Sequence, residues 1–207
     1  MVSRKDITAI ILAGGKSSRM GTDKGLVEFQ GKEMIAHVIQ NVKESVNDIL
    51  IISNNSAYRK FGYPVFEDIH KNCGPMGGIQ GGLSNSKTNW NLVIGCDLPF
   101  VTKEFFSFLV SSIVEGDAIV PIHDSFAEPL CALYHKSSLP KLEALLSKQE
   151  LKMQNVLKHL DSKFIDVPME MFDSTIIFRN FNSPKDFFSK INLVSLCLSG
   201  YLFFALI

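Results

Sequence analysis

Residues 7–26, ITAIILAGGKSSRMGTDKGL, constrain the fold of this chain more than any other stretch of the sequence. The stretch opens with an apolar, β-branched run over residues 7–12, which is typical of a buried strand. The run ends at Gly14 and Gly15, two adjacent glycines that let the main chain approach a bulky ligand closely. Successive N–H groups in such a loop form a concavity that suits phosphate oxygens. The stretch therefore predicts a phosphate-binding loop at the carboxyl end of a strand.

Three basic residues follow these glycines and add positive charge where a triphosphate would lie. They are Lys16, Arg19 and Lys24. Two familiar phosphate motifs are excluded by spacing, because a P-loop would need glycine at Ile10 and no glycines here have the separation of a dinucleotide-binding fingerprint. The stretch alone leaves two alternatives open, a nucleoside-triphosphate cradle and a glycine-rich turn without a ligand.

The composition is that of one globular domain, with 207 residues of which 46% are apolar and 20% charged. Lys and Arg total 21, as do Asp and Glu, so there is no overall positive field to attract nucleic acid or an anionic membrane. The four cysteines are far apart and form no C-x-x-C pair, and no secretory signal is evident. We therefore expect a cytoplasmic protein with reduced thiols and no nucleic-acid partner.

Apolar runs typical of strands alternate with segments of helical periodicity along most of the chain. The predicted strands are residues 7–12, 49–52, 63–66, 92–94, 118–122, 130–134 and 176–181. The predicted helices cover residues 33–45, 105–114, 139–146 and 156–160, the glycine-dense segment 73–83 leads into a short one, and a last one begins at Ser183. This alternation predicts an α/β fold with three layers, in which helices cover both faces of a mostly parallel sheet. The loops after the strands then share one edge, where such sheets bind ligands.

Asp97 is the candidate metal ligand in these loops. It follows the buried run 92–94 directly and precedes Pro99. A nucleoside triphosphate usually comes with Mg²⁺, which takes one or two protein carboxylates together with phosphate oxygens and water. The other interpretation is an aspartate that caps the next helix.

Three further features could serve a nucleotide at this edge, and each also has an ordinary structural explanation. Lys24, together with Arg19 and Lys16, could balance charge on the phosphates in the transition state, or be a solvated surface charge. Asp68 could accept from a sugar hydroxyl or a base edge, or cap a turn. The main chain of residues 74–82 has few side chains and could receive a flat base, or form a tight turn on the sheet. Since the five histidines show no metal-ligand spacing and no nucleophile is evident, we expect direct displacement at phosphorus.

Four motifs together resemble the molybdenum cofactor guanylyltransferase family. They are LAGGKSSRMGTDKGL at residues 12–26, GPMGGI at 74–79, CDLPF at 96–100 and NFNSP at 180–184. Many nucleotidyltransferases of glycosyltransferase-A-like fold share the first motif, whereas the combination is far more specific. The resemblance runs from about Ile7 to Phe188. It implies a three-layer Rossmann-like fold of the nucleotide-diphospho-sugar transferase type, in one nucleotidyltransferase domain over residues 1–190.

The resemblance also implies the reaction, a transfer of GMP from GTP to Mo-molybdopterin with release of pyrophosphate and with Mg²⁺ as cofactor. The implied nucleotide contacts come from Leu12, Ala13, Gly14, Lys24, Asp68 and Asp97. Catalytic roles fall to Asp97, Arg19 and Lys24, with Asp97 also on the metal, while Asn180 and Asn182 belong to the pterin side. Ser53 occupies a position where some members carry a nucleotide-contacting asparagine, and Asn55 is the nearer match to a second asparagine there. The implied partners are GTP, the molybdopterin cofactor, molybdopterin-inserting proteins and apo-molybdoenzymes.

Two other functions are compatible with the motifs. The first is another Mg²⁺-dependent nucleotidyltransferase, acting on cytidine nucleotides or sugar phosphates, because the opening motif is shared. The second is a non-catalytic nucleotide-binding protein that carries the cofactor to apoenzymes.

Residues 191–207, INLVSLCLSGYLFFALI, form an atypical apolar tail without a charged residue, whereas members of the family usually stop near residue 190. As a helix the tail would be about 26 Å long, just short of the roughly 30 Å hydrocarbon core of a membrane. A membrane anchor, a reading-frame irregularity and a segment buried against a partner all stay open, and a membrane is not the principal expectation.

Overall fold

A computed structural model describes residues 4–14, 23–70 and 72–179, and its centre is an eight-stranded sheet. The strands are β1 (Ile7–Leu12), β4 (Asp48–Ile52), β5 (Val65–Phe66), β6 (Trp90–Gly95), β7 (Ala118–His123), β8 (Phe126–Ala127), β9 (Cys131–His135) and β10 (Ser162–Asp166). Their order is β10-β7-β9-β6-β1-β4-β5, with β8 paired to β7. Along this order β9 is antiparallel to both of its neighbours, and the remaining pairs are parallel. A separate hairpin consists of β2 (Glu28–Phe29) and β3 (Lys32–Glu33).

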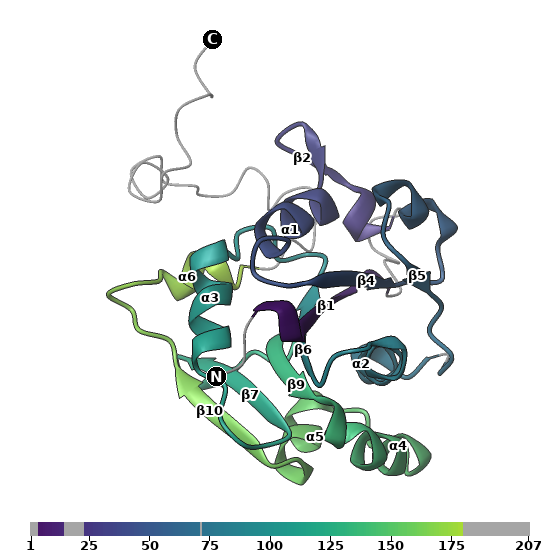
Figure 1. The fold of residues 1–207 in the computed structure, drawn as a ribbon, viewed down its shortest axis with the longest axis vertical. Helices are drawn as coiled ribbons and strands as arrows, with labels where there is room; N and C mark the ends of the chain where they lie inside the picture. The colour runs from purple at the N-terminus through teal and green to yellow at the C-terminus, as the bar shows by residue number, and fades with distance from the viewer. Residues whose placement is uncertain (1–3, 15–22, 71, 180–207) are drawn as a thin grey trace.

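Helices cover both faces of the sheet, so the predicted three-layer α/β fold is confirmed (Figure 1). One face carries α1 (Met34–Val42), α3 (Lys103–Ser111) and α6 (Ser174–Ile177), and the other carries α2 (Gly74–Asn85), α4 (Leu139–Ser147) and α5 (Met153–His159). The central strand β1 is buried along its whole length and supplies side chains to both cores. Ile11 packs with the first set of helices and Ile10 with the second, as the alternation of a strand requires.

The register of the central strands brings three loops together at the carboxyl edge of the sheet. Leu12, the last residue of β1, pairs with Ile52 at the end of β4 and with Gly95 at the end of β6. Two main-chain hydrogen bonds continue these pairings beyond the strands, from Ala13 N to Ile52 O at 2.9 Å and from Cys96 N to Leu12 O at 3.1 Å. The segments that follow β1, β4 and β6 therefore start side by side.

The glycine-rich segment is a helix, α2, that packs tightly on β1. A Cβ atom on Gly78 would lie 3.0 Å from Leu12 Cδ2, and one on Gly82 would lie 2.9 Å from Ile10 Cδ1. The glycines thus allow close contact between the helix and the sheet. The interpretation of residues 74–82 as open main chain for a flat base is therefore wrong after Gly78, since the helix uses its own N–H groups and Gly81 and Gly82 are buried and do not line the cleft.

The structure departs from the sequence-based prediction at two elements near the carboxyl end. Instead of a strand over residues 176–181, the chain forms the short helix α6, and Asp173 Oδ1 accepts from Thr175 N at 3.1 Å to cap it. The strand β10 was not predicted, because it lies at the edge of the sheet and only partly buries its side chains. The predicted helix at Ser183 and the tail 191–207 lie outside the described residues. Every helix in the described ranges is too short or too polar to span a lipid bilayer.

Candidate active site

A cleft of about 730 Å³ opens at the carboxyl edge of the sheet. It is formed by the segments that follow β1, β4 and β5 and by the first turn of α2. The residues that line it are Leu12, Gly14, Asp23, Ile52, Ser53, Asn54, Asn55, Asp68, Asn72, Gly74, Pro75 and Gly78. This volume lies in the range of pockets that hold small-molecule ligands.

Next to this cleft, Asp97 and Lys24 form an ion pair. Asp97 follows the end of β6, and Lys24 is the first residue of a short 3-10 helix, η2 (Lys24–Leu26). Lys24 Nζ lies 3.4 Å from Asp97 Oδ2, and the two side chains are 27% and 23% exposed. Because β6 ends beside β1, this pair stands at the same edge as Gly14. Both charges are therefore accessible to a ligand that extends out of the cleft.

The residues at this position fit a magnesium ion. Mg²⁺ prefers oxygen ligands, and water and substrate phosphates usually supply several of them. One partly exposed carboxylate, such as that of Asp97, is therefore enough as the protein's ligand. Among residues 4–14, 23–70 and 72–179 there is no group of three His, Cys, Asp or Glu side chains that could hold a metal ion. An ion at Asp97 would accordingly take its other ligands from the substrate and from water.

Asp23 is a residue of the site that the sequence analysis missed. Its Oδ1 accepts from the Tyr58 hydroxyl and from Gly25 N, and its Oδ2 accepts from Asn55 Nδ2 at 3.3 Å. It also lines the cleft and caps η2, which begins with Lys24. The only local signal for it in the sequence is a weak one, that aspartate is a typical N-cap residue.

Asp68 caps a turn, as one of the two interpretations predicts, and it also lines the cleft, where its contact with a nucleotide stays a prediction. Its N–H donates to Asn54 Oδ1 at 3.1 Å, and its Oδ1 accepts from His70 N at 2.9 Å. Burial raises the pKa of its carboxyl, and the hydrogen bond from His70 offsets part of that shift. A Cβ atom on Gly77 would lie 2.8 Å from Asp68 Oδ1, so a glycine of α2 makes room for this carboxylate.

The other residues proposed from the sequence fall into three groups. Leu12 and Gly14 line the cleft, as do Ser53 and Asn55. The side chain of Ala13 is buried in the core, so a nucleotide contact there would come from its main chain. Three residues, Arg19, Asn180 and Asn182, lie outside the described residues, as does Lys16.

A second polar pair lies at the same edge on the far side of β6. His123 ends β7, and its Nε2 is 2.8 Å from Glu128 Oε1. Burial raises the pKa of Glu128, and the hydrogen bond with His123 works in the opposite direction. The imidazole stacks on the Phe178 ring with centroids 4.7 Å apart. The sequence predicts no catalytic role for His123.

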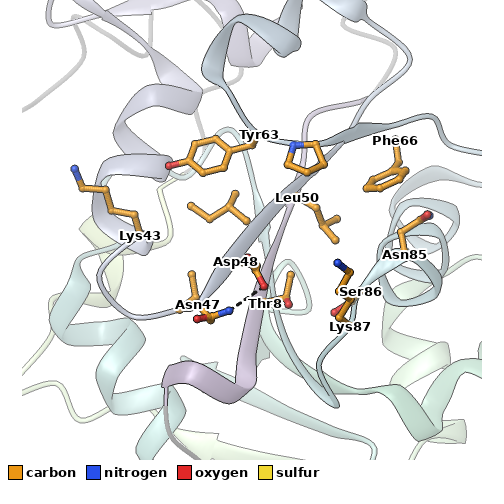
Figure 2. Close-up of a pocket in the computed structure, with 13 residues that line it drawn as sticks. Thr8, Lys43, Asn47, Asp48, Leu50, Tyr63, Phe66, Asn85, Ser86 and Lys87 are labelled. Atoms are coloured by element: carbon orange, nitrogen blue, oxygen red, sulfur yellow. Dashed lines mark hydrogen bonds between the residues drawn. The ribbon is translucent and has the colours of Figure 1, made fainter.

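A separate hollow of about 360 Å³ lies at the opposite edge of the sheet, where β1 and β4 begin (Figure 2). Figure 2 shows Leu50 near its middle, with Lys43 and Asn85 on opposite sides. Asp48 at the start of β4 accepts from Asn47 Nδ2 at 2.9 Å. The exposed lysines and aspartate of this hollow are remote from the cleft and provide matched controls for substitutions at Lys24 and Asp97.

Comparisons with known proteins identify the family of this chain. Residues 9–163 match the family model of the MobA-like NTP transferase domain, which is more than half of the chain. A molybdenum cofactor guanylyltransferase of Vibrio campbellii is 38% identical over 182 residues, covering 86% of this chain and 91% of the relative.

Solved structures are similar over nearly the same length. Molybdopterin-guanine dinucleotide biosynthesis protein A from Archaeoglobus fulgidus superposes with a TM-score of 0.75 at 25% identity, covering 91% of this chain and 98% of that one. A protein of Aquifex aeolicus gives a TM-score of 0.75 at 26% identity, covering 88% of this chain and 96% of that one. On this match of sequence and fold, the chain belongs to the MobA-like NTP transferase family and is a nucleotidyltransferase.

Proposed function

We propose that this chain transfers GMP from GTP to Mo-molybdopterin, with release of pyrophosphate and with Mg²⁺ as cofactor. The observation that carries the proposal is the Lys24–Asp97 pair, which stands at the carboxyl edge of the sheet beside a cleft of about 730 Å³. The relative from Vibrio campbellii, named a molybdenum cofactor guanylyltransferase, supports GTP and molybdopterin as the substrates.

The reaction needs no nucleophile from the protein. An oxygen of the terminal phosphate of the pterin attacks the α-phosphorus of GTP. The bond from that phosphorus to the oxygen that bridges to the β-phosphate breaks, and pyrophosphate leaves with the electron pair. Positioning and electrostatic stabilisation supply most of the catalysis in such phosphorus chemistry.

Asp97 and Lys24 provide the charges for this step. Asp97 would hold Mg²⁺ through its carboxylate, and the ion when bound would neutralise charge on the phosphates and on the leaving pyrophosphate. Lys24 Nζ, 3.4 Å from Asp97 Oδ2, can turn from the carboxylate to a phosphate oxygen of the bound nucleotide. Arg19, which follows Gly14 and Gly15 in the sequence, would add a further positive charge near the same phosphates.

The cleft would receive the nucleoside. Leu12 and Gly14 would lie against it from β1, and Asp68 would accept from a ribose hydroxyl or a base edge. Asn180 and Asn182 would contact the pterin. We place the reaction in the cytoplasm.

The decisive experiment incubates the protein with each of the four nucleoside triphosphates, with and without Mo-molybdopterin and Mg²⁺, and measures pyrophosphate. We expect release with GTP only, dependent on the pterin and abolished by EDTA. Release with CTP and a sugar phosphate or another acceptor would instead identify a different nucleotidyltransferase. Binding of GTP without pyrophosphate under every condition would identify a non-catalytic carrier.

A further inference from the structure

We propose that Tyr58 and Asn55 are positioning residues for Lys24, because they hold Asp23 and Asp23 holds the turn from which Lys24 extends. This inference rests on the proposed action of Lys24 on the phosphates. By this inference, the loop after β4, which lines the cleft, helps to hold the Lys24 ammonium group beside Asp97.

Tyr58 supplies the first contact with Asp23. It belongs to the 3-10 helix η3 (Ser56–Phe61), which follows the loop after β4, and its side chain is fully buried. Its hydroxyl donates to Asp23 Oδ1 across 35 positions of the sequence. Burial raises the pKa of Tyr58 far above its usual value, and the nearby Cys96 and Asp23 raise it further, so the hydroxyl remains a donor. A buried donor to a carboxylate fixes that carboxylate more firmly than a solvated one.

Asn55 supplies the second contact and is itself held by its own loop. Its N–H donates to Ser53 Oγ at 3.1 Å, and its Oδ1 accepts from Ala57 N at 3.0 Å. Its remaining amide group, Nδ2, donates to Asp23 Oδ2 at 3.3 Å. Ser53, Asn55 and Asp23 all line the cleft, so a nucleoside bound there would meet the residues that hold this contact.

The turn that carries Lys24 is fixed on its other side by close packing. Leu26 N donates to Asp23 O at 3.0 Å and Gly25 N donates to Asp23 Oδ1 at 3.4 Å. A Cβ atom on Gly25 would collide with the Tyr58 hydroxyl and would lie 3.1 Å from Cys96 Sγ. The main chain at Gly25, the residue after Lys24, is thus packed between Tyr58 and Cys96, the residue that precedes Asp97. The long side chain of Lys24 can change partners while its Cα stays in place.

Fixed placement of a charged group matters for catalysis, because a shift of about 1 Å can cost up to about a hundredfold in rate. The variant Tyr58→Phe removes the hydroxyl and keeps the ring. We expect kcat to fall by about tenfold and the affinity for GTP to weaken. In the Lys24→Ala background the same substitution should change both quantities less than about twofold, because it acts through Lys24.

The matched control is Tyr63→Phe, at the half-buried tyrosine of the hollow at the opposite edge of the sheet. It should leave kcat and the GTP dissociation constant unchanged. Calorimetric unfolding of each variant checks that the fold is retained. If Tyr58→Phe does not unfold cooperatively, Asp23→Asn replaces it in the comparison between the wild-type and Lys24→Ala backgrounds. This substitution breaks the contact of Asp23 with Asn55 at the surface of the cleft.

Two results would overturn the inference. One is an unchanged kcat and GTP affinity in a folded Tyr58→Phe protein, and the other is an equal loss in the wild-type and Lys24→Ala backgrounds. If the wild-type protein transfers no GMP, the proposed function fails. The coupling of Tyr58 to Lys24 is then still read from the dissociation constant of whichever nucleoside triphosphate binds.

Discussion

Lys24 Nζ lies 3.4 Å from Asp97 Oδ2 and joins two segments that are 73 positions apart in the sequence. Each charge partly neutralises the other at an edge where both side chains are accessible. A triphosphate with its metal offers a partner to both, an anion to Lys24 and a cation to Asp97. In the proposed reaction, binding would replace this ion pair by a contact of Lys24 with a phosphate and a contact of Asp97 with the metal.

The substitution Asp97→Asn should lower kcat by two or more orders of magnitude, since it removes the central electrostatic group of the site. The fold should survive, because Asp97 lies at the edge of the sheet and is partly exposed. Steady-state pyrophosphate release measures the effect, and Asp48→Asn, at an exposed aspartate of the opposite edge, is the control. A normal rate in Asp97→Asn would contradict the proposal that Asp97 holds the metal ion.

The substitution Lys24→Ala should weaken GTP binding by roughly tenfold or more and slow the transfer, because a hydrogen bond to a charged group contributes about 1.5–3 kcal/mol. Isothermal titration calorimetry gives the dissociation constant, and turnover is measured in the same preparation. Lys43→Ala, at an exposed lysine beside the hollow in Figure 2, controls for loss of surface charge. If the affinity for GTP were unchanged, Lys24 would be a solvated lysine without a role in binding.

Those parts of the fold that depend on local apolar pattern could be predicted from the sequence. The strands β1, β4 and β6 each contain a largely apolar run, and their parallel arrangement follows from the helices between them. The meeting of Gly14, Asp68 and the loop after β4 at one cleft follows in turn from the shared edge of parallel strands.

Features that depend on tertiary packing could not be predicted. The full length of α2 was hidden because glycines contribute no side chains to a periodic pattern, and the helix is stabilised by its fit against Ile10 and Leu12. The run at Ile176 and Ile177 favours a strand by composition, yet Asp173 caps a helix there. Asp23 gave only a weak local signal, since its main partners, Asn55 and Tyr58, lie more than thirty positions away.

The packing of α2 on β1 gives a matched pair of stability predictions. Gly82→Ala should destabilise the protein by about 1–3 kcal/mol, because the new methyl group would overlap the buried Ile10 side chain. Gly81→Ala, one position away, meets nothing within 4 Å and should stabilise the protein by up to about 1 kcal/mol through helix propensity. Urea unfolding measures both, and equal effects of the two substitutions would contradict the close contact.

Asp117 forms a buried anchor at the opposite edge of the sheet and gives a prediction about pH. Its Oδ2 accepts from Lys141 Nζ at 2.6 Å and from Asp161 N at 2.9 Å, and its Oδ1 accepts from Ser137 Oγ at 3.1 Å. Burial alone would raise the pKa of this carboxyl, but the hydrogen bonds, of which that from Lys141 is the largest, and the charge of Lys141 outweigh burial and lower the pKa below its usual value. The network joins α4 to the amino ends of β7 and β10.

Because the pKa of Asp117 is lower in the folded than in the unfolded protein, its ionised form stabilises the fold. This stabilisation is fully present above the unfolded pKa of about 3.9 and is lost as the pH falls through the lower, folded value. Asp117→Asn should therefore reduce the free energy of unfolding by about 1–3 kcal/mol near pH 7, and the difference from the wild type should shrink below about pH 4. Urea unfolding between about pH 7 and pH 3 measures the difference, with the exposed Asp48→Asn as the control. A difference that stayed constant over this range would show that the carboxylate charge of Asp117 does not stabilise the fold.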